Sequence, residues 1–182
     1  MAEHPMETTL RTVLWQQFGA AIDMLDNALL ACPSTLWHER IWSDSSIPDY
    51  PVFWNISFHT LFWLDFHLTG LPEEEFAPPA PFTKEELDPA GILPQRPFTK
   101  EELHGYLLQV RKKCQTTIAE LSDEKARQPV NYPWARGKPV SFLELLLYSM
   151  RHVQEHAAQL SLFLGLHGVS DEALDWVARA RG

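Results

Sequence analysis

The sequence predicts an all-α protein, a four-helix bundle with a long crossover loop and short extra helices. Apolar residues recur at three-four spacing in four long segments, and no segment shows the alternation that is typical of a strand. The 182 residues are 45% hydrophobic and include seven tryptophans, which is enough large apolar side chains for one core. We therefore expect a single domain over residues 1–182.

The first two helices are predicted from their apolar stripes and from the residues that end them. The first runs from about residue 8 to residue 31, and Pro33 helps to stop it. The second runs from 52 to 69, with Gly70 as its C-terminal cap. The inward stripe of this second helix consists of Ile56, His59, Trp63 and Phe66.

Residues 71–98 are predicted to form a proline-rich connection, because they hold seven of the chain's 14 prolines. The heptapeptide PFTKEEL occurs in this region at 81–87 and again at 97–103. Each copy carries a T-x-x-E capping box, Thr83 with Glu86 and Thr99 with Glu102. The first box should start only a turn or two, since Pro89 follows, whereas the second opens the third long helix.

The last long helix begins at a further capping box, Ser141 with Glu144, and ends before Gly168. It is the most apolar segment of the chain. A short final helix is expected from Ser170. Four long helices joined in part by one long crossover are the layout of a helical bundle.

Three histidines are candidates for a metal site. His152 and His156 lie four residues apart, so they are roughly 40° apart on one face of the last long helix. That face is otherwise largely apolar and should point into the bundle, as His59 should from the second helix. Three imidazoles can hold a divalent ion and leave positions open for water or substrate. From these residues alone, buried histidines satisfied by hydrogen bonds remain an equal alternative.

The string HVQEH also matches the H-x-x-E-H box of one class of zinc proteases. Such an enzyme needs a third ligand well downstream, yet only 26 residues follow His156, and Glu172 is the sole glutamate among them. Glu155 points roughly 60° away from His152 and 100° away from His156 around the helix. A surface ion pair with Arg151 explains Glu155 more simply than a role as general base, so it is a weak catalytic candidate.

Other polar residues lie within one helical turn of the three histidines. Asn55 precedes His59, Gln159 follows His156, and Tyr148 precedes His152 as a second weak catalytic candidate. Each can orient a ligand imidazole or a bound water, and each can equally be a hydrogen-bonded core group. Asp65 and His67 point roughly 120° and 80° away from His59, so we exclude both as ligands.

The composition argues against several classes of partner. A formal charge of −9 without a basic run does not suit nucleic acid. No segment approaches the roughly 20 apolar residues that cross a bilayer, and the N-terminus does not resemble a signal peptide. The sequence therefore predicts a cytoplasmic protein without membrane or nucleic-acid partners. Cys32 and Cys114 do not form a disulfide framework, and Cys114 falls on a core stripe.

The chain resembles the DinB/YfiT-like family, many of whose members have no known activity. The resemblance rests on NISFHTLFWLDFHL, on SFLELLLYSMRHVQEHAAQLSLFLG and on the PFTKEEL…YLLQVRKKC entry to the third helix. It implies a four-helix bundle with a divalent ion held by His59, His152 and His156. The resemblance further implies that the bound ion is zinc or nickel, with iron or manganese as alternatives. It also implies a possible homodimer.

Two functional hypotheses follow from the resemblance and the residues. In the first, a three-histidine ion activates water or a small thiol, as in a hydrolase or a thiol-dependent transferase or isomerase, on an unknown small-molecule substrate. In the second, the chain is a non-catalytic metal-binding or interaction module with a structural or vestigial ion. A DNA-damage role, which the family name suggests, has no support from the acidic charge.

Overall fold

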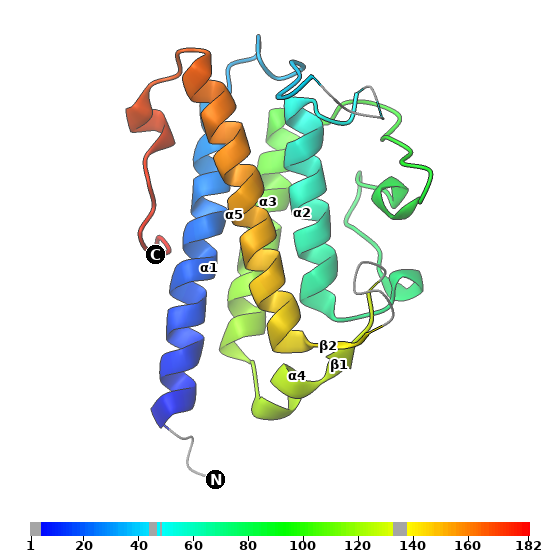
Figure 1. Ribbon diagram of the computed structural model, residues 1–182, viewed down its shortest axis with the longest axis vertical. Coiled ribbons are helices and arrows are strands. Elements are labelled where there is room, and N and C mark those ends of the chain that lie inside the picture. The colour runs from blue at the N-terminus through cyan, green and yellow to red at the C-terminus, as the bar shows by residue number, and fades with distance from the viewer. Residues whose placement is uncertain (1–4, 44–46, 48, 133–137) are drawn as a thin grey trace.

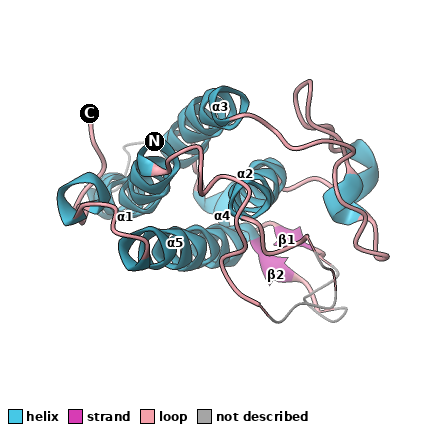
Figure 2. Ribbon diagram, turned by 90° about the horizontal axis from the view of Figure 1, so that it is seen from above, coloured by secondary structure: helices cyan, strands magenta, loops and turns pink. Residues whose placement is uncertain are grey.

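The protein is described by a computed structural model that covers residues 5–43, 47, 49–132 and 138–182. The predicted all-α class is confirmed (Figure 1). The four long helices are α1 (Pro5–Ala31), α2 (Phe53–Thr69), α3 (Lys100–Ala119) and α5 (Phe142–Leu166). Helices α1 and α2 each pack against both α3 and α5, so the four close around a shared interior (Figure 2).

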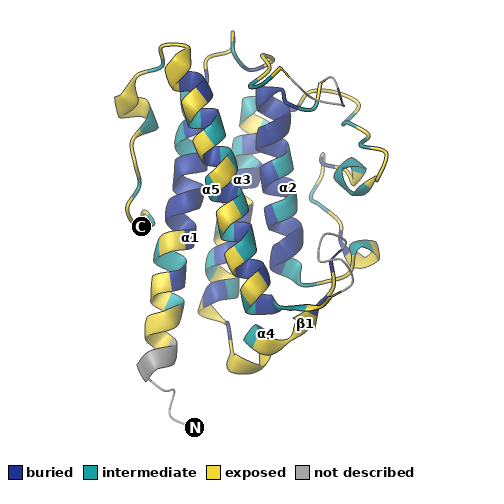
Figure 3. Ribbon diagram, viewed as in Figure 1, coloured by how far each residue is buried: buried dark blue, intermediate teal, exposed yellow. Residues whose placement is uncertain are grey.

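The proline-rich connection explains the order of the helices. Helices α1 and α5 run in one direction, whereas α2 and α3 both run in the opposite direction (Figure 1). The chain must therefore return along the whole bundle between α2 and α3, and residues 71–98 make this return beside α2. Helix α2 is buried along nearly its whole length (Figure 3).

Short elements complete the fold. The 3-10 helices are η1 (Glu73–Glu75), η2 (Glu85–Leu87) and η4 (Asp171–Leu174), and α4 (Asp123–Arg127) is a single short α-helix. The expectation of no strand is wrong in detail, because β1 (Pro129–Val130) and β2 (Val140–Ser141) pair antiparallel. Two residues a strand are too few to show an alternating pattern in the sequence. Among the helices of the described residues, none is long and apolar enough to cross a bilayer.

The capping boxes have different outcomes. The Thr99 box is confirmed in full, since its hydroxyl accepts from the Glu102 amide at 3.2 Å and the Glu102 carboxylate accepts from the Thr99 amide at 2.9 Å. The Ser141 hydroxyl likewise accepts from the Glu144 amide at 3.2 Å. The box predicted for Thr83 and Glu86 is wrong: Thr83 donates to Glu85 instead, and Glu86 turns toward α2.

Both copies of the repeated heptapeptide contribute a phenylalanine to the core. Phe82 and Phe98 lie 4.8 Å apart between ring centroids, and Phe82 stacks on Tyr106 of α3 at 4.3 Å. Phe98 also contacts Phe58 of α2 at 4.8 Å. These rings attach the connection to the bundle at two points. Cys114 is buried in the core as predicted.

The short helix expected from Ser170 forms only as the 3-10 helix η4, and the residues after it lie along α1 (Figure 1). The Ala180 amide donates to the Gln16 carbonyl at 2.9 Å, and the Arg181 amide donates to the buried Asp23 carboxylate at 2.6 Å. A Cβ atom on Gly19 would lie 2.5 Å from the Cβ of Ala180. The absence of a side chain at Gly19 therefore permits the close approach of this C-terminal segment.

Gly19→Ala is expected to release the C-terminal segment, even though alanine favours the helix by about 1 kcal/mol over glycine. The new methyl group overlaps Ala180, so the amides of Ala180 and Arg181 should exchange hydrogen at least about 10-fold faster, as measured by NMR. Ala180→Gly in the same chain removes the overlap and should restore slow exchange. Unchanged protection in Gly19→Ala would contradict this account of the contact.

Candidate metal centre

Three imidazoles meet between α2 and α5. The Nε2 atom of His59 lies 3.2 Å from Nε2 of His152, which lies 3.1 Å from Nε2 of His156. Potential ligand atoms of all three side chains lie within 4.8 Å of one another, and this is the one such group in the described part of the chain. The three side chains thus lie together between the two helices, as expected from the helical spacing of the histidines.

The hydrogen bonds on the far side of two rings leave lone pairs facing the centre. The Nδ1–H of His59 donates to Oε2 of Glu86 at 2.6 Å, and the Nδ1–H of His156 donates to Oε1 of Gln159 at 2.8 Å. Carboxylate and amide oxygens only accept, so in the tautomer that makes these bonds the hydrogen lies on Nδ1 and Nε2 keeps its lone pair. His152 Nε2 faces both of them, and one hydrogen cannot serve two acceptors well.

A cation between the three Nε2 atoms would accept their lone pairs. Imidazole nitrogens bind zinc at about 2.0–2.1 Å, which places two ligand nitrogens about 2.9 Å apart at right angles and about 3.4 Å apart in a tetrahedron. The observed separations of 3.1 and 3.2 Å lie between these values. The three histidines therefore fit a divalent transition metal.

Burial keeps the two rings of α5, His152 and His156, in the neutral form that can bind a metal. It lowers the pKa of His152 to about 2, and the neighbouring His59 and His156 act in the same direction. Burial, followed by His59, lowers the pKa of His156 to about 4. Both rings are consequently neutral at pH 7, and only a neutral imidazole can act as a ligand.

The flanking residues predicted from the sequence have unequal contacts with the histidines. Gln159 touches His156 directly. Asn55 touches none of the three: its amide donates to the Tyr50 carbonyl at 2.9 Å, and it is the Tyr50 hydroxyl that lies 2.9 Å from Nδ1 of His59. The side chain of Asn55 is therefore connected to the His59 ring through Tyr50.

The two weak catalytic candidates differ in position: the Tyr148 ring lies against His67 of α2, with ring centroids 5.7 Å apart, whereas Glu155 points away from the bundle. The Tyr148 ring lies nearly parallel to the His152 ring, with centroids 6.3 Å apart. The Arg151 guanidinium extends over Tyr148, 5.9 Å from the ring centroid, and Glu155 is exposed. No catalytic contact supports Glu155.

Asp65 and His67 occupy separate buried clusters. The Asp65 carboxylate accepts from the Tyr106 hydroxyl at 2.9 Å and from the Lys113 ammonium at 2.5 Å. His67 Nδ1 and the Ser149 hydroxyl share a hydrogen bond of 2.6 Å. Neither side chain belongs to the three-histidine group.

His67 should make the protein less stable in acid. Burial, followed by the neighbouring His59, lowers the pKa of His67 to about 3, against about 6.5 in the unfolded chain. Below pH 6.5 the unfolded state therefore binds a proton that the native state does not, and stability falls as the pH falls. For the metal-free protein, His67→Gln is expected to reduce the loss in free energy of unfolding between pH 7 and pH 5 by about 2 kcal/mol. Urea titrations at both pH values measure this, and equal losses in parent and variant would contradict it.

Two contacts of His59 come from residues that sequence patterns did not indicate. Glu86 lies in the connection, and its Oε2 atom also accepts from Nε1 of Trp63 at 3.1 Å. Tyr50 lies in the loop before α2. Neither segment has a helical period, so no rule of spacing could direct these side chains to His59. The nearest signal was the repeat itself, which has a glutamate at the position of Glu86 in both copies.

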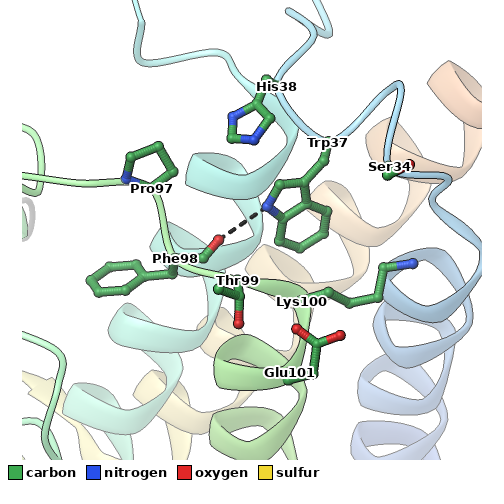
Figure 4. Close-up of a pocket in the computed structure, with 8 residues that line it drawn as sticks. All are labelled: Ser34, Trp37, His38, Pro97, Phe98, Thr99, Lys100 and Glu101. Carbon is green, nitrogen blue, oxygen red and sulfur yellow. Dashed lines mark hydrogen bonds between the residues drawn. The ribbon is translucent and has the colours of Figure 1, made fainter.

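A cavity of about 180 Å³ lies beside His59. Its walls include Tyr50, Trp63, Glu86 and Ile92. A larger cavity of about 490 Å³ lies at the end of the bundle where α3 begins, and none of the three grouped histidines lines it (Figure 4). There the Trp37 indole donates to the Phe98 carbonyl at 3.0 Å, while the Lys100 ammonium donates to the carbonyls of Leu30 and Cys32. The smaller cavity is the one next to the three-histidine group.

Comparison with protein families gives one match. A family model described as DinB superfamily matches residues 14–160, a range that contains α2, most of α5 and all three histidines. Neither the curated proteins nor the solved structures include a significant match to the chain. The family match covers most of the sequence and agrees with the all-α fold. The chain belongs to the DinB superfamily.

Proposed function

We propose that this protein is a metal-dependent enzyme in which His59, His152 and His156 hold one divalent transition ion. Zinc and nickel are the first candidates, with iron and manganese next. The reaction is hydrolysis or thiol-dependent transfer or isomerisation of a small molecule. The observation that carries the proposal is the convergence of three Nε2 atoms beside a cavity.

The bound ion would supply a Lewis acid that lowers the pKa of a water or thiol ligand. The protein's part is to hold the imidazoles and to shape the cavity. Glu86 accepts a hydrogen bond from the His59 ring and Gln159 accepts one from the His156 ring, and each bond orients its ring. Three protein ligands leave room for a further ligand, which a closed structural site with four protein ligands does not.

Tyr50 is suited to donate a hydrogen bond to a substrate. Its hydroxyl lies at the cavity, 2.9 Å from Nδ1 and 3.4 Å from Nε2 of His59. Burial, followed by the charge of Glu86, raises the pKa of Tyr50, so the phenol stays protonated. A neutral phenol next to the ligands can stabilise charge that develops on a substrate oxygen.

The cavity favours a neutral substrate. Trp63, Ile92 and Leu93 provide apolar surface, Glu86 provides a negative charge, and no lysine or arginine is among the described residues that line it. A strongly anionic molecule would be repelled there. The proposed substrate is therefore a small molecule without phosphate or several carboxylates.

Metal analysis of protein purified without an affinity tag tests the site. The parent is expected to carry close to one transition ion per chain. His59→Ala and His156→Ala should each carry much less, because two imidazoles hold an ion far more weakly than three. His38→Ala, which removes an exposed histidine outside the group, is the matched control and should equal the parent. Full metal content in His59→Ala and His156→Ala would show that the assignment is wrong.

Ligand exchange separates an enzyme from a module with a structural ion. The parent is loaded with cobalt, and 2-mercaptoethanol is added while the visible spectrum is recorded. An open position accepts the thiol and the spectrum should change. An unchanged spectrum at high thiol concentration would favour the non-catalytic module.

A further inference from the structure

We propose that Glu86 is a positioning residue of the metal site, and that through it the proline-rich connection 71–98 is coupled to metal binding. This inference rests on the proposed function. It assigns a role to a segment whose sequence suggested only a link between two helices.

The carboxylate of Glu86 is held by two donors from one helix. Its Oε2 atom accepts from Nδ1 of His59 at 2.6 Å and from Nε1 of Trp63 at 3.1 Å. His59 and Trp63 lie one turn apart on α2, so the two bonds determine where the carboxylate lies along that helix. The side chains of Glu86 and His59 are only 7% and 13% exposed, and such contacts are weakly screened by water.

This contact determines which nitrogen of His59 can bind metal. A hydrogen on Nδ1 is required by the carboxylate, and the lone pair on Nε2 then faces His152. A carboxylate partner also makes the imidazole a stronger base toward a cation. His156 has only the neutral amide of Gln159 for the same purpose. Among the described residues, Glu86 is the one carboxylate within hydrogen-bond distance of the three histidines.

The two copies of the heptapeptide differ in what their glutamate binds: Glu102 caps its own helix, whereas Glu86 bonds to His59 and caps no helix. In the second copy, Glu102 closes the capping box of its own helix. In the first copy, only the last three of the seven residues are helical, in the 3-10 helix η2. Its N-cap residue, Lys84, makes no side-chain cap bond. Glu86 makes no capping bond within its own segment and instead bonds to His59 of α2. Phe82, four residues earlier, is stacked on Tyr106 of α3.

Coupling between the connection and the ion follows from linkage. If the attached carboxylate strengthens metal binding, then bound metal must stabilise the attachment of the connection by the same factor. Residues 85–93 supply Glu86, Ile92 and Leu93 to the cavity, so the ion would also stabilise one wall of its own substrate site.

Glu86→Ala tests the role through metal affinity. Dissociation constants for zinc are measured by competition with a chelator of known affinity. Glu86→Ala is expected to bind about 10–100-fold more weakly than the parent, as for other outer partners of metal-bound histidines. Glu86→Gln keeps an acceptor but loses the charge, so its loss should be smaller. Glu74→Ala is the matched control, because Glu74 is an exposed glutamate of the same connection and does not line the cavity beside His59.

Hydrogen exchange of residues 85–93 provides a readout that a general loss of stability would not reproduce. Zinc should slow exchange of these amides in the parent and in Glu74→Ala, but not in Glu86→Ala. If Glu86→Ala does not fold, Glu86→Gln still tests the role, because its zinc affinity is expected to be lower than that of the parent. Parent-like affinity and parent-like protection in the Glu86 variants would overturn the inference while leaving the metal site intact. A parent that binds no zinc would instead overturn the proposed function.

Discussion

Removal of the metal with a chelator is expected to lower the Tm of the loaded protein by roughly 8–16 °C. An ion present at about 1,000 times its dissociation constant stabilises the native state by about 4 kcal/mol, because the unfolded chain lacks the assembled site. For a chain of this size, 1 kcal/mol corresponds to about 2–4 °C. Differential scanning calorimetry with and without added metal measures the shift.

The control for this shift is His152→Ala. His152 is the central member of the group, since its Nε2 atom faces those of both other histidines. Its removal leaves two imidazoles from different helices, and the difference in Tm between metal-loaded and chelated protein should nearly vanish. A shift of parental size in this variant would place the ion elsewhere in the molecule.

Asp65→Ala is expected to lower the free energy of unfolding by about 3 kcal/mol. The substitution leaves the buried Tyr106 hydroxyl without its acceptor and separates Lys113 from its carboxylate. Breaking a buried ion pair costs about 3–5 kcal/mol. The lower value applies here because the Lys113 side chain is 36% exposed and retains its bond to the Asp65 carbonyl at 2.9 Å. Urea unfolding of the metal-free protein measures the loss.

Asp65→Asn distinguishes charge from hydrogen bonding at this position. Asparagine keeps an oxygen for Tyr106, so about half of the loss should be recovered. Because Asp65 lies outside the three-histidine group, zinc affinity should be unchanged in both variants. A loss of zinc affinity without a loss of stability would contradict the structural role of Asp65.

Features that depend on local sequence could be predicted in advance. The start of α3 follows from the Thr99 capping box, and the inward positions of the three histidines follow from helical periodicity. The grouping of the three histidines was therefore accessible from spacing together with the family resemblance. Gln159 was accessible for the same reason, since a residue three positions after His156 lies over the same turn.

Features that depend on contacts between distant segments could not be predicted. Glu86 has the same local sequence as Glu102, and only the position of the connection beside α2 gives it a different partner. The C-terminal segment was expected to be helical beyond its first turn. Asn27 and Gln17 of α1 instead donate to the carbonyls of Asp175 and Ala178, which would have bonded within a helix. In both places a tertiary contact outweighs local preference.

The distribution of the three candidate ligands along the chain has a consequence for biosynthesis. His59 and His152 are 93 residues apart, so α3 and the whole proline-rich connection are translated between them. At about 5–20 residues per second, the two histidines emerge from a ribosome roughly 5–20 s apart. Glu86 follows His59 by only 27 residues and can already orient its ring during that interval. Under the proposed function, metal loading is then expected to be a late step, because the three histidines meet only once α5 has been synthesised and packed against α2.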